Sequence, residues 1–346
     1  MALAATACQG QSNAQPTRVP TDIAPTPTVR STPLPDAPIA PVLGAGPREI
    51  TLLFAQFGDT PTQNARRAAN DLQQQLTDDL GLEIKVAFVD ENDALQAICG
   101  GAPRAAWVSP FTYVKAQTQC GAVTVLAVTR GRSPNVTLGR TAEIIARADI
   151  TALSQLNGQT FCRSQEQDYF TSWVFPNLLM ASQGVNPITG LSATQDYPDD
   201  LSLGRALYDN KCAAAALPPG AFEDLLIDLS GALSTDESRV TSSDLAAALH
   251  VLTRAGNTAP SAGQTVIGSN VIPYETLVFA PDSALPADLR ERITQTVESF
   301  FSDRADGTGR LNALLDATGI MSVNENTYSA FRSLVVNAGW DMTFTE

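Results

Sequence analysis

The chain has 346 residues, of which 44% are hydrophobic, and its 22 basic against 36 acidic residues give a formal net charge of −14. This length is enough to bury two hydrophobic cores. The acidic balance, without a Lys/Arg cluster, argues against nucleic acid or an anionic membrane surface as a partner. No stretch approaches the ~20 uninterrupted apolar residues of a membrane span, so we expect a soluble globular body.

The N-terminal residues Leu3 to Cys8 are similar to the end of a bacterial lipoprotein signal, in which small residues precede a Cys that is lipidated. Residues 1–8 are expected to be the remnant of such a signal, with Met1 either a late start or the result of truncation, because they are too few for a basic and an apolar region. Residues 9–47 are rich in Pro and Thr without apolar periodicity, which predicts a disordered tether. A disordered leader with one accidental Cys is the alternative.

From residue 48 the chain alternates apolar strands with amphipathic helices, which predicts α/β lobes built from βαβ units. Strands are predicted at 49–54, 82–89, 105–108, 123–129, 141–147, 158–163 and 212–217, with an extended return at 263–280. Helices are predicted at 60–80, 92–98, 110–119, 169–183, 199–208, 286–301, 309–318 and 324–338, with a helical turn at 153–156.

The turn after the strand at 105–108 is the first candidate site. Ser109 is a good N-cap, and Pro110 suits the first helical position, where its missing N–H costs nothing. Such a helix points N–H groups beyond the strand, where an anion can bind, and Ser109, Thr112 and Tyr113 would add hydroxyls. An ordinary βα turn with a capping Ser and a core aromatic is the alternative.

Four cysteines remain if Cys8 is lipidated, and four allow three pairings. Cys99 and Cys120 end successive helical segments, whereas Cys162 and Cys212 each stand in an apolar strand-like run. We therefore favour the pairs 99–120 and 162–212, with four separate buried thiols as the alternative. The chain has no C-x-x-C pair. Its only His, His250, stands in a helix-like apolar segment. We therefore expect neither a metal nor a cofactor.

Seven segments follow one another in a fairly specific order: FAQFG (54–58), VDENDALQAICGG (89–101), AAWVSPFTYVKA (105–116), LSQLNGQTFCRS (153–164), GRALYDNKCAAAAL (204–217), IPYETLVFAPDSALPADLRERI (272–293) and LLDATGIMSVNENTYSAFR (314–332). Together they resemble the phosphate, phosphite and phosphonate substrate-binding proteins of ABC importers. The resemblance implies the two-lobed type II periplasmic-binding-protein fold, in which each lobe is a mainly parallel sheet flanked by helices and two hinge strands join the lobes. Lobe I would comprise 48–137 and 274–346, and lobe II 138–273, with hinges near 138–143 and 269–276.

The same resemblance implies a ligand site in the cleft. Tyr113 matches the cleft aromatic of the family's Gly-Pro-x-x-Tyr turn, with Ser109 in place of Gly. In the family's Ser-x-Ser-Gly helix start, Thr171 keeps a hydroxyl, whereas Tyr169 replaces the first Ser and Ser172 the Gly. The family's next His corresponds to Asp199 or Asp200, and its acid after the Ala-rich strand is missing at 217–219. The ligand-binding candidates are Gln56, Ser109, Phe111, Thr112, Tyr113, Arg163, Tyr169, Thr171, Ser172, Asp199 and Tyr274.

Three candidates have alternative roles. The fork of Arg163 suits a carboxylate, sulfonate or phosphonate, but it would equally pair with Glu166 or Asp168. Asp199 would also be favourable as a helix N-terminal charge. Tyr274 either contacts ligand or packs the hinge strands.

The function that the resemblance implies is that of an extracytoplasmic solute-binding lipoprotein of an ABC importer, a monomer anchored to the bacterial cell membrane by lipid on Cys8. It would capture a small oxyanion and present it to ABC permease subunits. Because the paired Ser and the acid are lost, a carboxylate, a sulfonate or a larger phosphonate stays open. A sensing lipoprotein without a transport role is an alternative. A hydrolase or transferase on the same scaffold is less favoured, because the chain lacks G-x-S-x-G, Walker A and G-x-G-x-x-G motifs.

Overall fold

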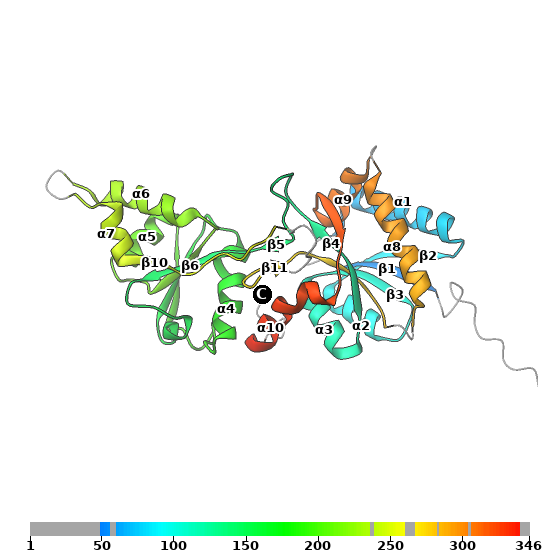
Figure 1. Cartoon of the computed structure of the whole chain (residues 1–346), viewed down its shortest axis with the longest axis horizontal. Helices are drawn as coiled ribbons and strands as arrows, with labels where there is room; N and C mark the ends of the chain where they lie inside the picture. The colour runs from blue at the N-terminus through cyan, green and yellow to red at the C-terminus, as the bar shows by residue number, and fades with distance from the viewer. Residues whose placement is uncertain are drawn as a thin grey trace, which may run out of the picture. The chain divides into compact units, whose positions relative to one another are not determined.

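The computed structural model describes residues 49–55, 60–235, 239–259, 267–281, 284–303 and 306–339 (Figure 1). The predicted signal remnant, its Cys8, the tether and Gln56 lie outside these residues. Within the described ranges, no helix is both long and apolar enough to cross a membrane.

Lobe I is built on a six-stranded sheet in the order β13-β4-β12-β3-β1-β2. β1 pairs parallel with β2 and β3, whereas β12 is antiparallel to β3 and β4, and β13 is antiparallel to β4. β12 is antiparallel to its neighbours because the chain enters it directly from the second hinge strand. The strands are Ile50–Ala55 (β1), Ile84–Val89 (β2), Arg104–Val108 (β3), Val123–Thr129 (β4), Thr276–Phe279 (β12) and Gly319–Ser322 (β13).

Lobe II is built on a five-stranded sheet in the order β10-β6-β9-β7-β8. β7 is parallel to β8 and β9, whereas β6 is antiparallel to β9 and β10. Each sheet is therefore mixed and not mainly parallel as expected: lobe I has two parallel and three antiparallel strand pairs, and lobe II has two of each. The strands are Glu143–Arg147 (β6), Thr160–Ser164 (β7), Ala193–Tyr197 (β8), Ala214–Leu217 (β9) and Leu249–Thr253 (β10).

Two short strands carry the chain between the lobes. Gly139–Arg140 (β5) on the outward path pairs antiparallel with Ile272–Pro273 (β11) on the return path. A Cβ on Gly139 would lie 2.5 Å from the Ile272 carbonyl oxygen, so only glycine allows the two strands to approach this closely. These strands form the hinge of the fold.

The helices cover both faces of each sheet. β3 shows the effect in lobe I: Ala105 and Trp107 pack in a core with α1 and α8, whereas Ala106 and Val108 join a second core with α2 and α3. The lobe I helices are Gln63–Leu80 (α1), Glu91–Cys99 (α2), Pro110–Cys120 (α3), Ala287–Ser302 (α8), Gly307–Leu315 (α9) and Ser329–Ala338 (α10), with Glu325–Tyr328 (η4) before α10.

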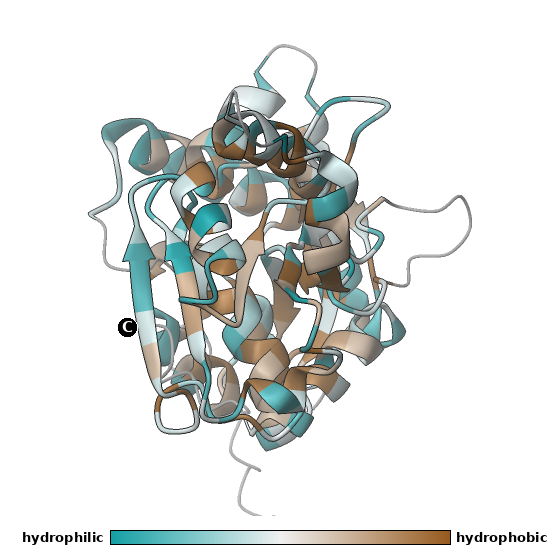
Figure 2. Ribbon diagram, turned by 90° about the vertical axis from the view of Figure 1, so that its left-hand side faces the viewer, coloured by the Kyte–Doolittle hydropathy of each residue, from teal (hydrophilic) through white to brown (hydrophobic). Residues whose placement is uncertain are grey.

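Lobe II has its own helical layers. It faces the viewer in Figure 2, where its hydrophobic segments gather in the interior. Phe331 of α10 and Phe175 of α4 belong to one continuous core cluster, so the last helix of lobe I packs against lobe II. The lobe II helices are Leu153–Leu156 (η2), Phe170–Val174 (η3), Phe175–Ser182 (α4), Asp200–Tyr208 (α5), Ala221–Leu233 (α6) and Ser242–Ala248 (α7).

Both predicted disulfide pairings are present. Cys99 is joined to Cys120 with a Cα–Cα distance of 5.5 Å, which ties the end of α2 to the end of α3. Cys162 is joined to Cys212 with a Cα–Cα distance of 5.9 Å, which ties β7 to the residues before β9. Each bridge lies within one lobe, so neither restrains the hinge.

Two local predictions are wrong. The expected single helix at 169–183 begins as a π-helix, η3, and becomes α-helical only at Phe175. Pro176 has no N–H to donate to the preceding turn, which accounts for this irregularity. His250 lies in β10, paired with Ala146, and not in a helix. Sheet pairing decides the conformation of this short apolar segment, which is compatible with either structure.

Candidate functional site

A cavity of about 360 Å³ is lined by residues of both lobes and of both hinge strands. Lobe I contributes the start of α3, the residue after β4 and the residues before β12, and lobe II contributes η3. The lining residues are Ser109, Pro110, Phe111, Arg130, Arg140, Tyr169, Phe170, Val174, Ile272, Pro273, Tyr274 and Glu275.

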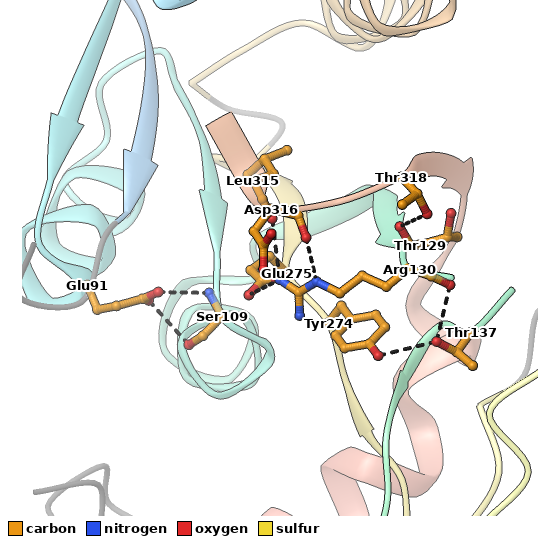
Figure 3. Close-up of polar contacts among 10 residues, drawn as sticks. All are labelled: Glu91, Ser109, Thr129, Arg130, Thr137, Tyr274, Glu275, Leu315, Asp316 and Thr318. Atoms are coloured by element: carbon orange, nitrogen blue, oxygen red, sulfur yellow. Dashed lines mark hydrogen bonds and ion pairs between the residues drawn. The ribbon is translucent and has the colours of Figure 1, made fainter. Parts of the chain in front are cut away.

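The start of α3 forms one wall, and its polar groups have partners within the protein. The Ser109 N–H donates to Glu91 Oε1 (2.9 Å), and the Ser109 hydroxyl lies 3.3 Å from Glu91 Oε2 (Figure 3). The Thr112 N–H donates to Ser109 Oγ at 3.3 Å, as the N-cap prediction requires. Burial raises the pKa of the Glu91 carboxyl, and hydrogen bonds from Thr112 and Ser109 oppose that rise. The carboxylate of Glu91 therefore takes a place at this helix start that an external anion would otherwise use.

Arg130, directly after β4, is held by several acceptors of lobe I. Its Nε donates to the carbonyl oxygen of Asp316 (2.8 Å), and its Nη2 lies 3.1 Å from Glu275 Oε2 and 3.3 Å from the carbonyl oxygen of Leu315. The guanidinium stacks 4.3 Å from the centre of the Tyr274 ring. Figure 3 shows this arrangement. Arg130 is thus a fixed part of the wall.

Arg140, on hinge strand β5, has a simpler environment. Its Nη2 is paired with Asp168 Oδ2, and its guanidinium stacks 4.2 Å from the centre of the Phe170 ring. The other carboxylate oxygen of Asp168 accepts the Thr171 N–H (2.8 Å) at the start of η3. The side chains of Arg140 and Asp168 are 39% and 55% exposed, so water reaches both partners of this ion pair.

The remaining wall is apolar. Phe111, Phe170 and the half-exposed Tyr169 present aromatic rings, and hinge strand β11 contributes Ile272 and Pro273. The cavity thus combines two arginines, each paired with a carboxylate, with a largely apolar and aromatic lining. An anionic ligand that also has an apolar part suits this lining where it can replace a carboxylate at an arginine.

Four of the predicted ligand residues, Ser109, Phe111, Tyr169 and Tyr274, line the cavity. Tyr274 also contacts the hinge, because its N–H donates to the Leu138 carbonyl oxygen (3.0 Å); its hydroxyl lies 3.2 Å from the Thr137 hydroxyl. Tyr113 does not line it: the side chain is fully buried in lobe I, with its ring 4.9 Å from that of Tyr328. Burial raises the pKa of Tyr113 to about 12.

The other predicted residues have contacts outside the lining. Arg163 Nε and Nη2 lie 2.7 Å and 3.0 Å from the two carboxylate oxygens of Asp196, and its guanidinium lies over Trp173. The partner is neither Glu166 nor Asp168, because β7 and β8 bring positions 163 and 196 into register. The Asp199 carboxylate accepts the Ser202 N–H (2.6 Å) as the N-cap of α5, and this hydrogen bond lowers its pKa.

Thr171 and Ser172 are buried in η3, and neither is among the lining residues. The Thr171 N–H donates to the Asp168 carboxylate, and the Ser172 N–H donates to the Asp168 carbonyl oxygen at 3.0 Å. The N–H groups of Thr171 and Ser172, which were expected to face an oxyanion, are thus already bonded within the protein. Direct ligand roles for Thr112, Tyr113, Arg163, Thr171, Ser172 and Asp199 stay predictions.

Four lining residues, Arg130, Arg140, Phe170 and Glu275, are not among the ligand residues predicted from the sequence. Arg140 had one available signal, because it is a cation within the predicted hinge at 138–143. Within the described ranges, no group of three or more His, Cys, Asp or Glu side chains is placed to hold a metal ion.

Two α/β lobes, two hinge strands and a cavity between the lobes define a periplasmic binding protein of the type II fold. A family model for the periplasmic phosphonate substrate-binding proteins of ABC transporters matches residues 57–328. The chain therefore belongs to this family, as the order of its sequence segments indicates. A comparison with curated protein sequences finds no match.

Solved structures similar to this chain include a binding-protein component of an ABC phosphonate transporter from Pseudomonas aeruginosa. It is 15% identical, with 84% of this chain and 86% of that chain covered and a TM-score of 0.43. PhnD1 from Prochlorococcus marinus, in complex with methylphosphonate, is 11% identical over 85% of this chain and 99% of that chain (TM-score 0.43). A Xanthomonas citri protein bound to chloride ion is 12% identical, with 84% of this chain and 97% of that chain covered and a TM-score of 0.45.

Family membership makes the chain a substrate-binding protein of the ABC transporter type, which works outside the cytoplasm and passes small ligands to a permease. The family is one of solute-binding proteins and not of enzymes.

Proposed function

We propose that the cavity between the lobes captures a small organic or inorganic anion of the phosphonate type for delivery to an ABC permease. The observation that carries the proposal is the placement of Arg140, whose ion pair with Asp168 is exposed, beside the fixed Arg130 in one cavity whose wall includes both hinge strands. A guanidinium offers the planar fork that phosphonate, sulfonate and carboxylate oxygens accept.

Hinge motion would complete the binding. The lobes are joined by β5 and β11, and each disulfide lies within one lobe, so rotation about the hinge breaks no covalent link. Closure would remove water from the cavity and strengthen the interaction between the anion and the arginines, because charges interact more strongly where the dielectric constant is lower. The permease would then recognise the closed, loaded lobes.

The test is a thermal-shift screen of the purified chain with phosphate, phosphite and methylphosphonate, together with neutral sugars. A ligand at 100 times its dissociation constant stabilises the fold by about 2.7 kcal/mol, which raises the melting temperature measurably. We expect at least one anion to raise it and Arg140→Gln to reduce the shift, whereas Arg205→Gln, at an exposed position of α5, leaves it unchanged. Stabilisation by neutral sugars alone would contradict the proposal.

We also propose that Cys8 is lipidated and that residues 9–47 tether the lobes to the outer face of the cell membrane as a monomer. The support is the small-residue run that leads into Cys8 and the Pro- and Thr-rich stretch that follows. Mass spectrometry of the membrane fraction should find a lipidated Cys8 peptide, and Cys8→Ser should release the protein. An unmodified Cys8 in a cytosolic protein would contradict this.

A further inference from the structure

We infer that the cavity takes an organic anion with one acidic head group and an aromatic or branched aliphatic body, and that Arg140 binds the head in exchange for Asp168. This inference rests on the proposed function and names the class of ligand for the same cavity. Three features carry it: the bonded helix starts, the different environments of the two arginines, and the size and lining of the cavity.

Among the described residues, the N–H groups of Ser109 and Thr112 at the start of α3, and of Thr171 and Ser172 in η3, are already bonded within the protein. At α3, Glu91 accepts the Ser109 N–H, and the Ser109 hydroxyl accepts the Thr112 N–H. At η3, Asp168 accepts both the Thr171 N–H and the Ser172 N–H. An external anion at either place would displace a carboxylate or lie beside it, and like charges repel. Recognition of the acidic head therefore falls to the arginines.

Of the two arginines, Arg140 is the one that a ligand can recruit. Arg130 uses its Nε and Nη2 groups on two carbonyl oxygens and on Glu275, so these donors hold segments of lobe I together. Arg140 has one polar partner among the described residues, Asp168, and both side chains are more than a third exposed. An exposed ion pair contributes little to stability, so an incoming acid can replace Asp168 at small cost. One recruitable guanidinium serves one acidic group.

The cavity is larger and more apolar than a bare oxyanion needs. Its volume of about 360 Å³ lies in the range of pockets for organic ligands, whereas one water molecule takes about 30 Å³ of liquid. Phosphate or methylphosphonate would leave most of the apolar wall in contact with water. An aromatic or branched body would cover that wall and gain from removing apolar surface from water. The apolar and aromatic residues are Pro110, Phe111, Tyr169, Phe170, Val174, Ile272, Pro273 and Tyr274.

The test is isothermal titration calorimetry of the full chain with phenylphosphonate, methylphosphonate and phosphate under the same conditions. We expect phenylphosphonate to bind about tenfold or more tightly than methylphosphonate, because the ring buries extra apolar surface. Arg140→Gln should weaken the binding of phenylphosphonate by about tenfold or more. Tyr169→Ala should weaken phenylphosphonate and leave methylphosphonate almost unchanged. Tyr208→Ala, at an exposed tyrosine outside the cavity, is the matched control and should change neither.

The outcomes separate this inference from the proposed function. Methylphosphonate binding as tightly as phenylphosphonate, with Tyr169→Ala affecting neither, would overturn the inference and leave the capture of an anion intact. Phenylphosphonate binding that survives Arg140→Gln would overturn the assignment of Arg140 to the head group. If the wild-type chain binds none of these anions, nor benzoate or benzenesulfonate, the proposed function itself fails.

Discussion

Two clusters at the cavity each contain an arginine, an aromatic ring and a carboxylate, and they differ in how firmly the arginine is held. Arg130 stacks on Tyr274 and pairs with Glu275, while Arg140 stacks on Phe170 and pairs with Asp168. The first guanidinium also binds the carbonyl oxygens of Asp316 and Leu315, which brings the end of α9 to the end of β4. The second guanidinium has no such backbone partner among the described residues.

The comparison shows that an arginine in a ligand cavity is not necessarily a ligand residue. The Arg130 cluster joins segments of lobe I that are far apart in the sequence, so the Nε and Nη2 donors of Arg130 serve the fold. The Arg140 cluster joins a hinge strand to the first turn of η3 across an exposed ion pair, so its donors can change partner. We therefore expect substitutions in the two clusters to separate stability from binding.

The largest expected effect is on stability. Arg130→Ala removes hydrogen bonds to two carbonyl oxygens and the cation beside Glu275, and we expect a loss of about 2 kcal/mol in the free energy of unfolding. Arg140→Ala removes an exposed ion pair, and we expect a loss of about 0.5 kcal/mol. Urea denaturation of both variants measures the difference. Equal losses would remove the distinction between the clusters.

A second prediction concerns affinity. Asp168→Asn removes the charge that competes for Arg140 but keeps a side-chain oxygen to accept the Thr171 N–H, since Asn is as good a helix cap as Asp. We expect phenylphosphonate to bind about threefold to tenfold more tightly, which corresponds to about 0.7–1.4 kcal/mol. Asp149→Asn, at an exposed aspartate paired with Arg147 in lobe II, is the matched control. Weaker binding to the Asp168→Asn variant would show that the carboxylate itself supports the ligand.

The smallest expected effect is on how the free energy of unfolding depends on pH through Glu91 of lobe I. Burial raises the pKa of Glu91, so the folded chain holds this proton more tightly than the unfolded chain. The stabilising contribution is fully present below the unfolded pKa and is lost as the pH rises through the folded pKa. Glu91→Gln stays neutral, so the stability of this variant relative to wild type should increase between pH 4 and pH 7.5. Urea denaturation at both values would contradict this if the difference were constant or reversed.

The sequence predicts the parts of the site that have local causes. The strand at 105–108, the Ser109 cap and Pro110 at the start of the helix are all observed, because cap geometry and apolar runs act over a few residues. Cys99 and Cys120 end successive helices, and Cys162 and Cys212 stand in or next to neighbouring strands, so both disulfide pairs could be predicted. The hinge positions come from the resemblance to the family, and β5 and β11 lie within them.

The parts that depend on tertiary contacts are not visible in the sequence. Arg130 and Arg140 are single cations in a turn and a short strand. Their roles depend on the ion pairs with Glu275 and Asp168, two residues that are distant in the sequence and that the fold places beside them. Arg163 illustrates the reverse: a promising position after a strand proves to be paired across the sheet with Asp196. The edge strand β8 is mostly exposed and polar, so it carries no alternation from which to predict it.

The most direct test of the account is a crystal structure of the full chain with phenylphosphonate. We predict that a phosphonate oxygen lies about 3 Å from a guanidinium nitrogen of Arg140 and that the ring packs against Tyr169 or Phe170. The Asp168 carboxylate should have left Arg140, while Arg130 keeps its contacts with Asp316 and Glu275. A phosphonate group bound at the Ser109 or Thr171 N–H groups, or outside the cavity between the lobes, would contradict the account.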